Sequence, residues 1–354
     1  MKRIHQEFWV GKKVLITGHT GFKGAWLSLW LQFLGAELQG LALDPPTSPS
    51  LFDEARVAEG MVSWTGDITD LDTVKNCMEA FRPEMIVHLA AQALVRRSYL
   101  EPVETFSTNV MGTLNILEAA RSLDSVRCIL NVTSDKCYEN REWSWGYREN
   151  EPMGGHDPYS SSKGCSELLS SAYRRSFFQS KGVALATARA GNVIGGGDWA
   201  EDRLVPDILR ALQSGCSPVI RNPGSVRPWQ HVLEPLSGYL MLLKALWENG
   251  PKYSEAWNFG PEDDDAQPVG DVLRKMSQFW GTDAVWQHDG ENQPHEAVFL
   301  KLDISKAKQK LGWRPRWNLD KALENTVAWH KAWLDRRDMR AYCLNEISAY
   351  LKNR

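Results

Sequence analysis

The stretch Lys13-Val-Leu-Ile-Thr-Gly-His-Thr-Gly-Phe-Lys-Gly24 decides the fold of this 354-residue chain. Its apolar, partly β-branched start predicts a buried strand, and the dense apolar segment 25–34 that follows predicts a helix. Between them, Gly18 permits a tight turn, Gly21 lets a pyrophosphate approach the backbone, and Gly24 lets helix and strand pack closely. Because free N–H groups at a helix start attract anions, the stretch predicts a dinucleotide site rather than a glycine-rich turn without a ligand.

The composition narrows the class of protein. Hydrophobic residues make up 43% and charged residues 24%, as in ordinary globular domains, and the length allows one large domain or one and a half. A net charge of −3 argues against a nucleic-acid-binding surface. The amino-terminal residues lack the apolar core of a signal peptide, and segment 25–34 is too short to span a bilayer, so we expect no membrane partner. Six scattered cysteines predict reduced thiols in a cytoplasmic protein, with no metal site and no disulfide framework.

Strands and helices alternate regularly over residues 13–189. This order predicts an α/β fold with a doubly wound parallel sheet of the Rossmann kind, in which the ligand lies at the carboxyl ends of the strands. After that point the order is less regular. We therefore expect a dinucleotide-binding domain formed by 1–190 and 229–260, and a smaller substrate-binding domain formed by 191–228 and 261–354.

The segment 38–43 predicts the second strand, which ends at Asp44. A carboxylate about 20 residues past the glycines accepts hydrogen bonds from the adenosine ribose and disfavours a 2′-phosphate, so NAD is favoured over NADP. The alternative is an acidic loop residue before Pro45. His19 and Lys23 lie beside the pyrophosphate by position. One interpretation is that His19 or Lys23 adds positive charge at the pyrophosphate. The other is that Lys23 is a solvated residue at the start of the helix.

A second motif consists of Tyr159 and Lys163. Four residues apart on a helix, both side chains lie on one face. An ammonium group close to a phenol lowers the pKa of the phenol, which produces a base able to take a hydroxyl proton while hydride leaves the same carbon. By itself the spacing is common on exposed helix faces. Here it follows a glycine motif, and Ser134-Asp135-Lys136 stands at the carboxyl end of a predicted strand, 127–133.

The Gly-x-x-Gly-x-x-Gly spacing together with Tyr-x-x-x-Lys resembles the extended short-chain dehydrogenase/reductase family, and nearly the whole chain is similar to its nucleotide-sugar 4,6-dehydratases. Those enzymes carry a Ser/Thr-Asp-Glu triplet. The resemblance implies that Ser134 bonds the sugar 4-hydroxyl and that Asp135 protonates the departing 6-hydroxyl. Lys136 stands where the glutamate would remove the C5 proton. The Asp-Lys pair and the stretches 189–199 and 227–232 are similar to the members that act on CDP-glucose.

The lysine at position 136 leaves two mechanisms open. Lys136 serves as the C5 base if burial or a neighbouring cation keeps it neutral. Alternatively, a charged Lys136 stabilises the enolate-like state while another group or water takes the proton. We favour a direct role for Lys136. The competing structural interpretation of Asp135 and Lys136 is an ion pair at the end of a strand.

The resemblance implies conversion of CDP-glucose to CDP-4-keto-6-deoxyglucose and water, with hydride passing from C4 to C6 through bound NAD, in deoxysugar and O-antigen precursor synthesis. The alternatives are a nucleotide-sugar 4-epimerase, which needs no acid at Asp135, and a non-catalytic NAD- or nucleotide-sugar-binding protein. By the same resemblance, helices 103–121 and 159–179 pair across a two-fold axis. A homodimer is therefore expected, and a tetramer is left open.

The resemblance also implies two sets of binding residues. Those expected at the cofactor are Gly18, His19, Gly21, Phe22, Lys23, Gly24, Asp44, Asp67, Ile68, Leu89, Ala90, Ala91, Thr108, Tyr159 and Lys163. Those expected at the nucleotide diphosphate are Asn192 and Arg227, with Arg203 and Asn258 as weaker candidates. The dehydratases of dTDP-glucose carry a further arginine near residues 294–299, where this chain has none, so contacts to the nucleotide base are not carried over.

Overall fold

The computed structural model describes residue 4 and residues 6–283, 285–288 and 299–352. Its centre is a seven-stranded parallel sheet in the order β11-β6-β5-β4-β1-β2-β3. The strands are β1 (Lys13–Thr17), β2 (Glu37–Ala42), β3 (Val62–Thr65), β4 (Met85–His88), β5 (Cys128–Val132), β6 (Ala184–Arg189) and β11 (Ala256–Asn258). The order reverses between β1 and β4, which is the point where doubly wound sheets bind ligands. The predicted fold class is confirmed.

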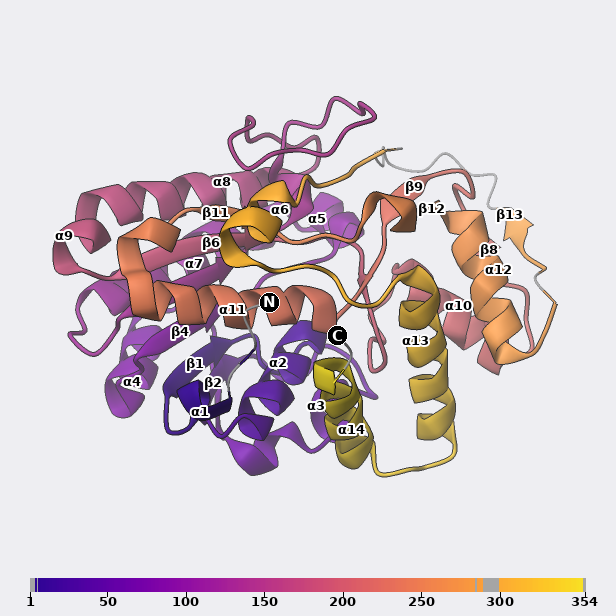
Figure 1. The fold of residues 1–354 in the computed structure, drawn as a ribbon, viewed down its shortest axis with the longest axis horizontal. Helices are drawn as coiled ribbons and strands as arrows, with labels where there is room; N and C mark the ends of the chain where they lie inside the picture. The colour runs from indigo at the N-terminus through magenta and orange to yellow at the C-terminus, as the bar shows by residue number, and fades with distance from the viewer. Residues whose placement is uncertain (1–3, 5, 284, 289–298, 353–354) are drawn as a thin grey trace.

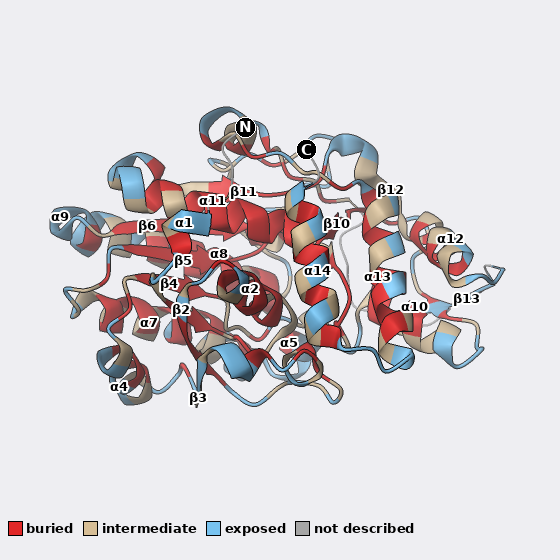
Figure 2. Ribbon diagram, turned by 60° about the horizontal axis from the view of Figure 1, so that its bottom comes forward, coloured by how far each residue is buried: buried red, intermediate tan, exposed pale blue. Residues whose placement is uncertain are grey.

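Helices cover both faces of this sheet (Figure 1). The first face carries α2 (Phe22–Phe33), α11 (Leu233–Asn249) and α14 (Met339–Lys352). The second face carries α4 (Leu71–Phe81), α7 (Gly112–Arg121) and α8 (Pro158–Tyr173). Successive strand residues alternate between the faces: Val14 and Ile16 join the first core, whereas Leu15 joins the second. Figure 2 shows the central strands as buried, with exposed residues on the outer sides of the helices; β3, at the edge of the sheet, is mostly exposed.

A smaller core lies beside the sheet, around α10 (Leu204–Gln213), α12 (Val269–Trp280) and α13 (Leu319–Leu334) (Figure 1). Short strands border it: β7 (Val193–Ile194), β8 (Val219–Ile220), β9 (Val226–Pro228), β10 (Gln230–His231), β12 (Ala266–Pro268) and β13 (Gln287–His288). The residues 300–317 and α14 pack instead into the first core of the sheet. Their apolar side chains cover α2 and α11, and the predicted assignment of these two segments to the substrate-binding domain stays a prediction.

Two predicted long helices are interrupted by π-helical turns. The segment 103–121 consists of α6 (Pro102–Phe106), the turn Ser107–Met111 and α7, and the segment 159–179 consists of α8, the turn Arg174–Phe178 and α9 (Gln179–Lys181). The remaining elements include α1 (Gln6–Trp9), α3 (Leu51–Glu54), α5 (Val95–Leu100) and the π-helical turn Ala307–Leu311. Within the described ranges, no helix is long and apolar enough to cross a membrane.

Local signals explain where α8 begins. The Asp157 carboxylate accepts the backbone N–H of Ser160 at 2.9 Å, and Pro158 occupies the first helical position, where no N–H is needed. This cap fixes the register of the helix, so that Tyr159 stands in the first turn and Lys163 follows one turn later. Both side chains are buried against the end of the sheet.

Candidate active site

The glycine turn between β1 and α2 has the shape that a pyrophosphate needs. Gly18 has a φ of +74°, and a Cβ there would lie 2.7 Å from the backbone nitrogen of Ala90. A Cβ at Gly24 would lie 2.1 Å from the carbonyl oxygen of Gly18, so both positions require glycine. At Gly21, an added Cβ would meet only that same oxygen, at 3.5 Å. That side of the turn is therefore open, and the residues present fit a dinucleotide.

The two basic residues of this turn have different surroundings. His19 is buried, its Nε2 lies 2.7 Å from Ser63 Oγ, and burial lowers its pKa to about 4. It is neutral near pH 7, so the option that His19 adds positive charge is wrong. Burial, and then the charge of Arg203, lower the pKa of Lys23 to about 8, while Asp135 acts in the opposite direction. Lys23 therefore lies among the catalytic candidates, and the solvated alternative is wrong for it.

The remaining cofactor candidates follow the strands at the same edge of the sheet. Asp44 is exposed two residues beyond β2, as a contact with a ribose requires. Asp67 accepts the backbone N–H of Thr69 at 2.8 Å, and Ile68 is buried against α7. Half-buried Phe22 lies at the start of α2, half-buried Leu89, Ala90 and Ala91 follow β4, and half-buried Thr108 stands in the π-helical turn. The structure brings these residues to one edge, and their cofactor contacts stay predictions.

The end of β5 holds the acid. Ser134 Oγ donates to Asp135 Oδ1 at 3.1 Å and accepts the backbone N–H of Lys136 at 3.2 Å. Asp135 is 2% exposed, and its other oxygen, Oδ2, has no hydrogen-bond partner among the described residues. The buried Ser-Asp pair excludes the interpretation of Asp135 as part of a surface ion pair.

Tyr159 faces this pair from α8. Burial raises the pKa of Tyr159 to about 12; a hydrogen bond with Ser134 and the charge of Arg203 lower it, and Asp135 raises it further. Burial also lowers the pKa of Lys163 to about 8, against the effect of the neighbouring Cys137. At Tyr159, burial outweighs the hydrogen bond with Ser134 and the charge of Arg203, and the predicted effect of Lys163 on this phenol stays a prediction. The structure brings the phenol close to Ser134 and Asp135, and the catalytic roles of these residues stay predictions.

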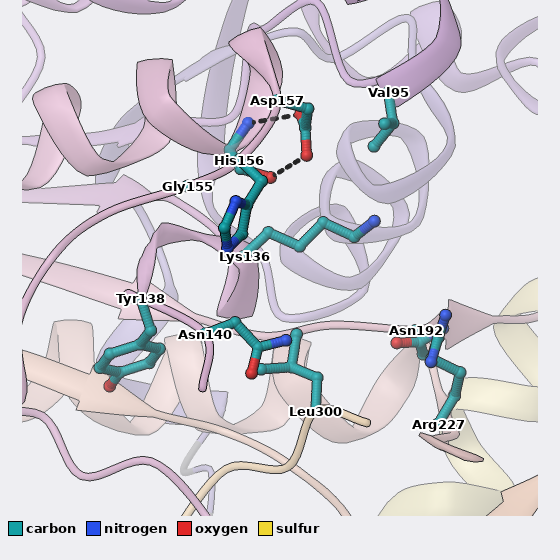
Figure 3. Close-up of a pocket in the computed structure, with 11 residues that line it drawn as sticks. Val95, Lys136, Tyr138, Asn140, Gly155, His156, Asp157, Asn192, Arg227 and Leu300 are labelled. Atoms are coloured by element: carbon teal, nitrogen blue, oxygen red, sulfur yellow. Dashed lines mark hydrogen bonds between the residues drawn. The ribbon is translucent and has the colours of Figure 1, made fainter. Parts of the chain in front are cut away.

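A small cavity of about 40 Å³ opens beside these residues (Figure 3). Lys136 extends into it, and Asn192 and Arg227 lie together on another side, as the prediction of a diphosphate site requires. Ser160, the neighbour of Tyr159, also lines it. The cavity thus joins the lysine that replaces the expected glutamate to the candidate phosphate ligands.

The two weaker substrate candidates differ in outcome. Arg203 lies close enough to Lys23 and Tyr159 to shift their pKa values, and it donates to Asp198 at 2.9 Å. Asn258 is fully buried: its amide nitrogen donates to two backbone carbonyls, and its amide oxygen accepts the Tyr138 hydroxyl at 2.8 Å. Protein groups thus occupy the side chain of Asn258 in this structure, and its contact with substrate stays a prediction. Residues 294–298 lie outside the described residues.

Sequence reasoning missed a buried ion pair behind the site. Arg189, the last residue of β6, donates to both oxygens of Glu167 at 2.8 and 2.9 Å. Thr133 and Thr187 donate to the same carboxylate at 2.5 and 2.7 Å. The signal for Glu167 was its position one further helical turn beyond Lys163, on the same face of α8. These bonds lock α8 to the end of β5.

Comparisons with known proteins fit this geometry. A family model described as GDP-mannose 4,6 dehydratase matches residues 15–326. A CDP-glucose 4,6-dehydratase from Salmonella typhimurium is 57% identical over 353 residues, which cover 98% of each chain. A probable dTDP-glucose 4,6-dehydratase from Sinorhizobium fredii is 26% identical and covers 90% of this chain and 92% of its own.

Solved structures show the same fold. A UDP-glucose 4-epimerase from Thermus thermophilus, in complex with NAD, has a TM-score of 0.78 at 25% identity, over 90% of this chain and 98% of that chain. A dTDP-glucose 4,6-dehydratase from Bacillus anthracis, also in complex with NAD, has a TM-score of 0.74 at 19% identity, and the match covers 92% of this chain and 99% of that chain. One fold therefore serves both epimerases and dehydratases, so the site residues must separate the two activities.

Proposed function

The chain belongs to the GDP-mannose 4,6-dehydratase family, within the extended short-chain dehydrogenases/reductases, and from this we propose that it is an NAD-dependent CDP-glucose 4,6-dehydratase. The observation that carries the proposal is the 57% identity to a CDP-glucose 4,6-dehydratase across 98% of both chains. The product would be CDP-4-keto-6-deoxyglucose, which feeds deoxysugar and O-antigen precursor synthesis. The placement of an acid at Asp135, opposite Tyr159, supports a dehydratase against the epimerase alternative.

The open side of the glycine turn and the small residues after β4 would hold the cofactor. When bound there, NAD⁺ would supply an acceptor for the C4 hydride of the sugar and a donor for its return to C6. Tyr159 takes the proton of the 4-hydroxyl, and its hydrogen bond with Ser134 acts to lower the pKa of the phenol. Lys163, one helical turn away, places a cation on the same face of α8.

Elimination of water then needs an acid and a base. The C4 ketone makes the C5 proton acidic. Asp135, protonated at that stage, gives its proton to the 6-hydroxyl, which leaves as water. Lys136 is the described side chain next to the acid that extends into the cavity, and we assign it the direct role at C5. After hydride has reached C6, C5 is reprotonated.

The nucleotide diphosphate would lie against Asn192 and Arg227 in the same cavity. Arg227 is largely buried there, where a charge-assisted bond to phosphate is stronger than at the surface. Arg203 would add a second positive charge near Tyr159. We also propose the division into a dinucleotide-binding unit around the sheet and a smaller unit around α10, α12 and α13.

We further propose a homodimer in the cytoplasm. Apolar side chains remain exposed on the neighbouring helices that would pair: Val103 and Phe106 on α6, Met111 in the π-helical turn, and Leu168 on α8. Exposed apolar side chains on neighbouring helices are typical of an interface between copies of a chain. All six cysteines are free thiols, which supports a reducing compartment.

One assay tests the function. Purified protein is incubated with NAD⁺ and, in parallel, with CDP-, dTDP-, UDP- or GDP-glucose, and the products are weighed by mass spectrometry. We expect loss of one water from CDP-glucose at a far higher rate than from the others. A product of unchanged mass that has become the galactose epimer would instead identify a 4-epimerase, and no product would identify a binding protein.

A further inference from the structure

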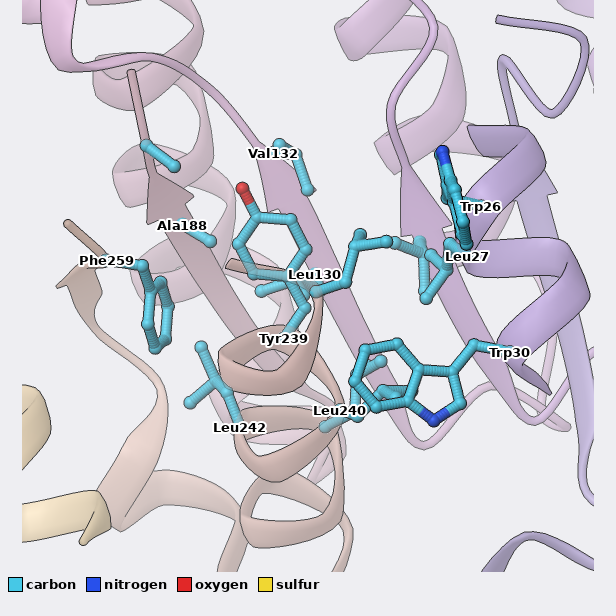
Figure 4. Packing of buried hydrophobic residues seen from close by; sticks show 14 of the residues in the cluster. Trp26, Leu27, Trp30, Leu130, Val132, Ala188, Tyr239, Leu240, Leu242 and Phe259 are labelled. Atoms are coloured by element: carbon cyan, nitrogen blue, oxygen red, sulfur yellow. The ribbon is translucent and has the colours of Figure 1, made fainter. Parts of the chain in front are cut away.

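Two buried polar groups near the end of β5 have no hydrogen-bond partner among the described residues: Asp135 Oδ2 and the hydroxyl of Tyr239. Tyr239 stands on α11, under the sheet, and is fully buried. Figure 4 shows its hydroxyl pointing toward the end of the sheet where Val132 lies. Val132 is the last residue of β5, and Asp135 follows three residues later.

Asp135 Oδ2 and the Tyr239 hydroxyl lie on the protein side of the site, toward α11 (Figure 4). A Cβ added at Gly191 would lie 1.7 Å from Asp135 Oδ2, so this oxygen is pressed against the backbone there. The other oxygen, Oδ1, accepts from Ser134. Burial raises the pKa of Tyr239, and the charges of Asp135 and Tyr159 raise it further, so the phenol keeps its proton. Among the described residues, Tyr239 is therefore a buried hydrogen-bond donor with no acceptor within hydrogen-bonding distance, and Asp135 Oδ2, toward the same end of β5, is an acceptor with no donor (Figure 4).

In the proposed dehydration, a hydrogen-bond donor such as the Tyr239 hydroxyl would stabilise the acid after it has lost its proton. When the O–H bond of the acid breaks, its proton leaves with the 6-hydroxyl as water, and a negative charge stays on the buried Asp135. An unsatisfied carboxylate oxygen in a buried site is costly, whereas the protonated acid is less so. The charge would be stabilised by a donor that meets the inner oxygen at that moment.

We propose that Tyr239 is a positioning residue for the acid: its hydroxyl donates a hydrogen bond to Oδ2 of Asp135 as that carboxyl gives up its proton. The inference rests on the proposed function, and it deepens the role of the same site. Tyr239 keeps its own proton throughout. It touches neither substrate nor cofactor, and it acts through Asp135.

The competing explanation is that Tyr239 only fills the core. Its ring packs edge-on against Phe259, with the centroids 5.5 Å apart. A phenylalanine would keep that contact and remove an unpartnered polar group, so a purely structural role predicts no loss of stability and no loss of activity for Tyr239→Phe. Tyr350→Phe is the matched control, because the Tyr350 hydroxyl also faces α11 but has a partner there, Glu234, at 2.7 Å.

The test uses the full chain with NAD⁺ and two substrates: CDP-glucose, and its 6-deoxy-6-fluoro analogue, whose fluoride leaves without needing a full proton. For Tyr239→Phe we expect water loss from CDP-glucose to fall about 10- to 100-fold, the worth of one hydrogen bond to a charged group. Reduced cofactor should accumulate in a single turnover, since oxidation at C4 is untouched. Fluoride loss should stay near the wild-type rate. Tyr350→Phe should lower the thermal midpoint and change neither rate.

Three outcomes would overturn the inference: a wild-type rate of water loss, an equal fall for both substrates, or a Tyr239→Phe variant that does not fold. Adding Tyr239→Phe to Asp135→Asn should cause no further loss if the phenol acts through the acid. If the wild-type enzyme releases no water from CDP-glucose, the proposed function itself fails. If the wild-type enzyme is active and Tyr239→Phe is equally active, the function stands and only the role of Tyr239 fails.

Discussion

Glu167 and Asp135 are both buried carboxylates near the end of β5, but their surroundings differ. Glu167 accepts four hydrogen bonds, from Arg189 twice and from Thr133 and Thr187. Asp135 accepts one, from Ser134, and one of its oxygens has no partner in the described part of the chain. A carboxylate whose oxygens are all hydrogen-bonded to protein groups has no free lone pair for a substrate. A carboxylate with an oxygen that lacks a partner can exchange a proton with the substrate.

The difference separates the part of the site that holds its shape from the part that reacts. Glu167 and Arg189 connect α8, β5 and β6, and through them fix the positions of Tyr159 and Ser134. Asp135 follows β5, which Glu167 and Arg189 hold in place, but its own side chain accepts only one hydrogen bond from the described residues. Substitutions at the two carboxylates should therefore affect different quantities.

Asp135→Asn is the substitution with the largest expected effect. The amide keeps the shape and the bond to Ser134 but cannot act as an acid, so water loss from CDP-glucose should fall about 10²- to 10⁴-fold. Oxidation at C4 should survive, visible as reduced cofactor in a single turnover. The thermal midpoint should hardly change, because one hydrogen bond is involved. An active variant would remove Asp135 from the acid role.

Lys136→Met tests the neighbour of the acid. The substitution keeps the length of the side chain and removes the amine, so we expect C4 oxidation to remain in part and water loss to fall about 100-fold. Exchange of the C5 proton with deuterated solvent should disappear as well. Normal product formation would exclude Lys136 from the chemistry and leave the C5 proton to another group.

Arg189→Met should break the framework rather than the chemistry. Removing one partner of a buried ion pair leaves an uncompensated carboxylate, and typically costs about 3–5 kcal/mol of the free energy of unfolding. Urea unfolding would measure it. Arg56→Ala is the control, because the Arg56–Asp338 pair is exposed and its loss should leave the unfolding curve unchanged. Equal curves for Arg189→Met and wild type would contradict the framework role.

Much of the reactive part was predictable from sequence. The spacing of Tyr159 and Lys163 follows helical geometry, and the position of Ser134 and Asp135 follows from a strand that ends beside them. The open face at Gly21 also follows from the motif. These predictions succeed because each depends on local periodicity and on the parallel order of the strands.

The rest depends on burial, which local patterns do not reveal. The environments of His19 and Lys23 could not be separated, since one side chain packs between strands and the other turns into the site. The protein partners of Asn258 could not be predicted because they, like Tyr138, lie far away in sequence. Tyr239 was missed because its helix is apolar throughout, and no spacing sets one buried phenol apart.

The smallest expected effect is an acid titration that compares wild type with Glu167→Gln. Burial alone would raise the pKa of Glu167, but the charge and hydrogen bonds of Arg189 outweigh it and lower the pKa below its ordinary 4.5. Because the folded-state pKa is depressed, the stabilisation is complete above about pH 4.5 and is lost as the pH falls through the folded value. Between about pH 5 and about pH 3, the unfolding free energy of wild type should fall more steeply than that of Glu167→Gln, by at most about 1.4 kcal/mol per pH unit. Parallel curves from urea unfolding would mean that Glu167 gains nothing from its four donors, and the contrast with Asp135 would lose its basis.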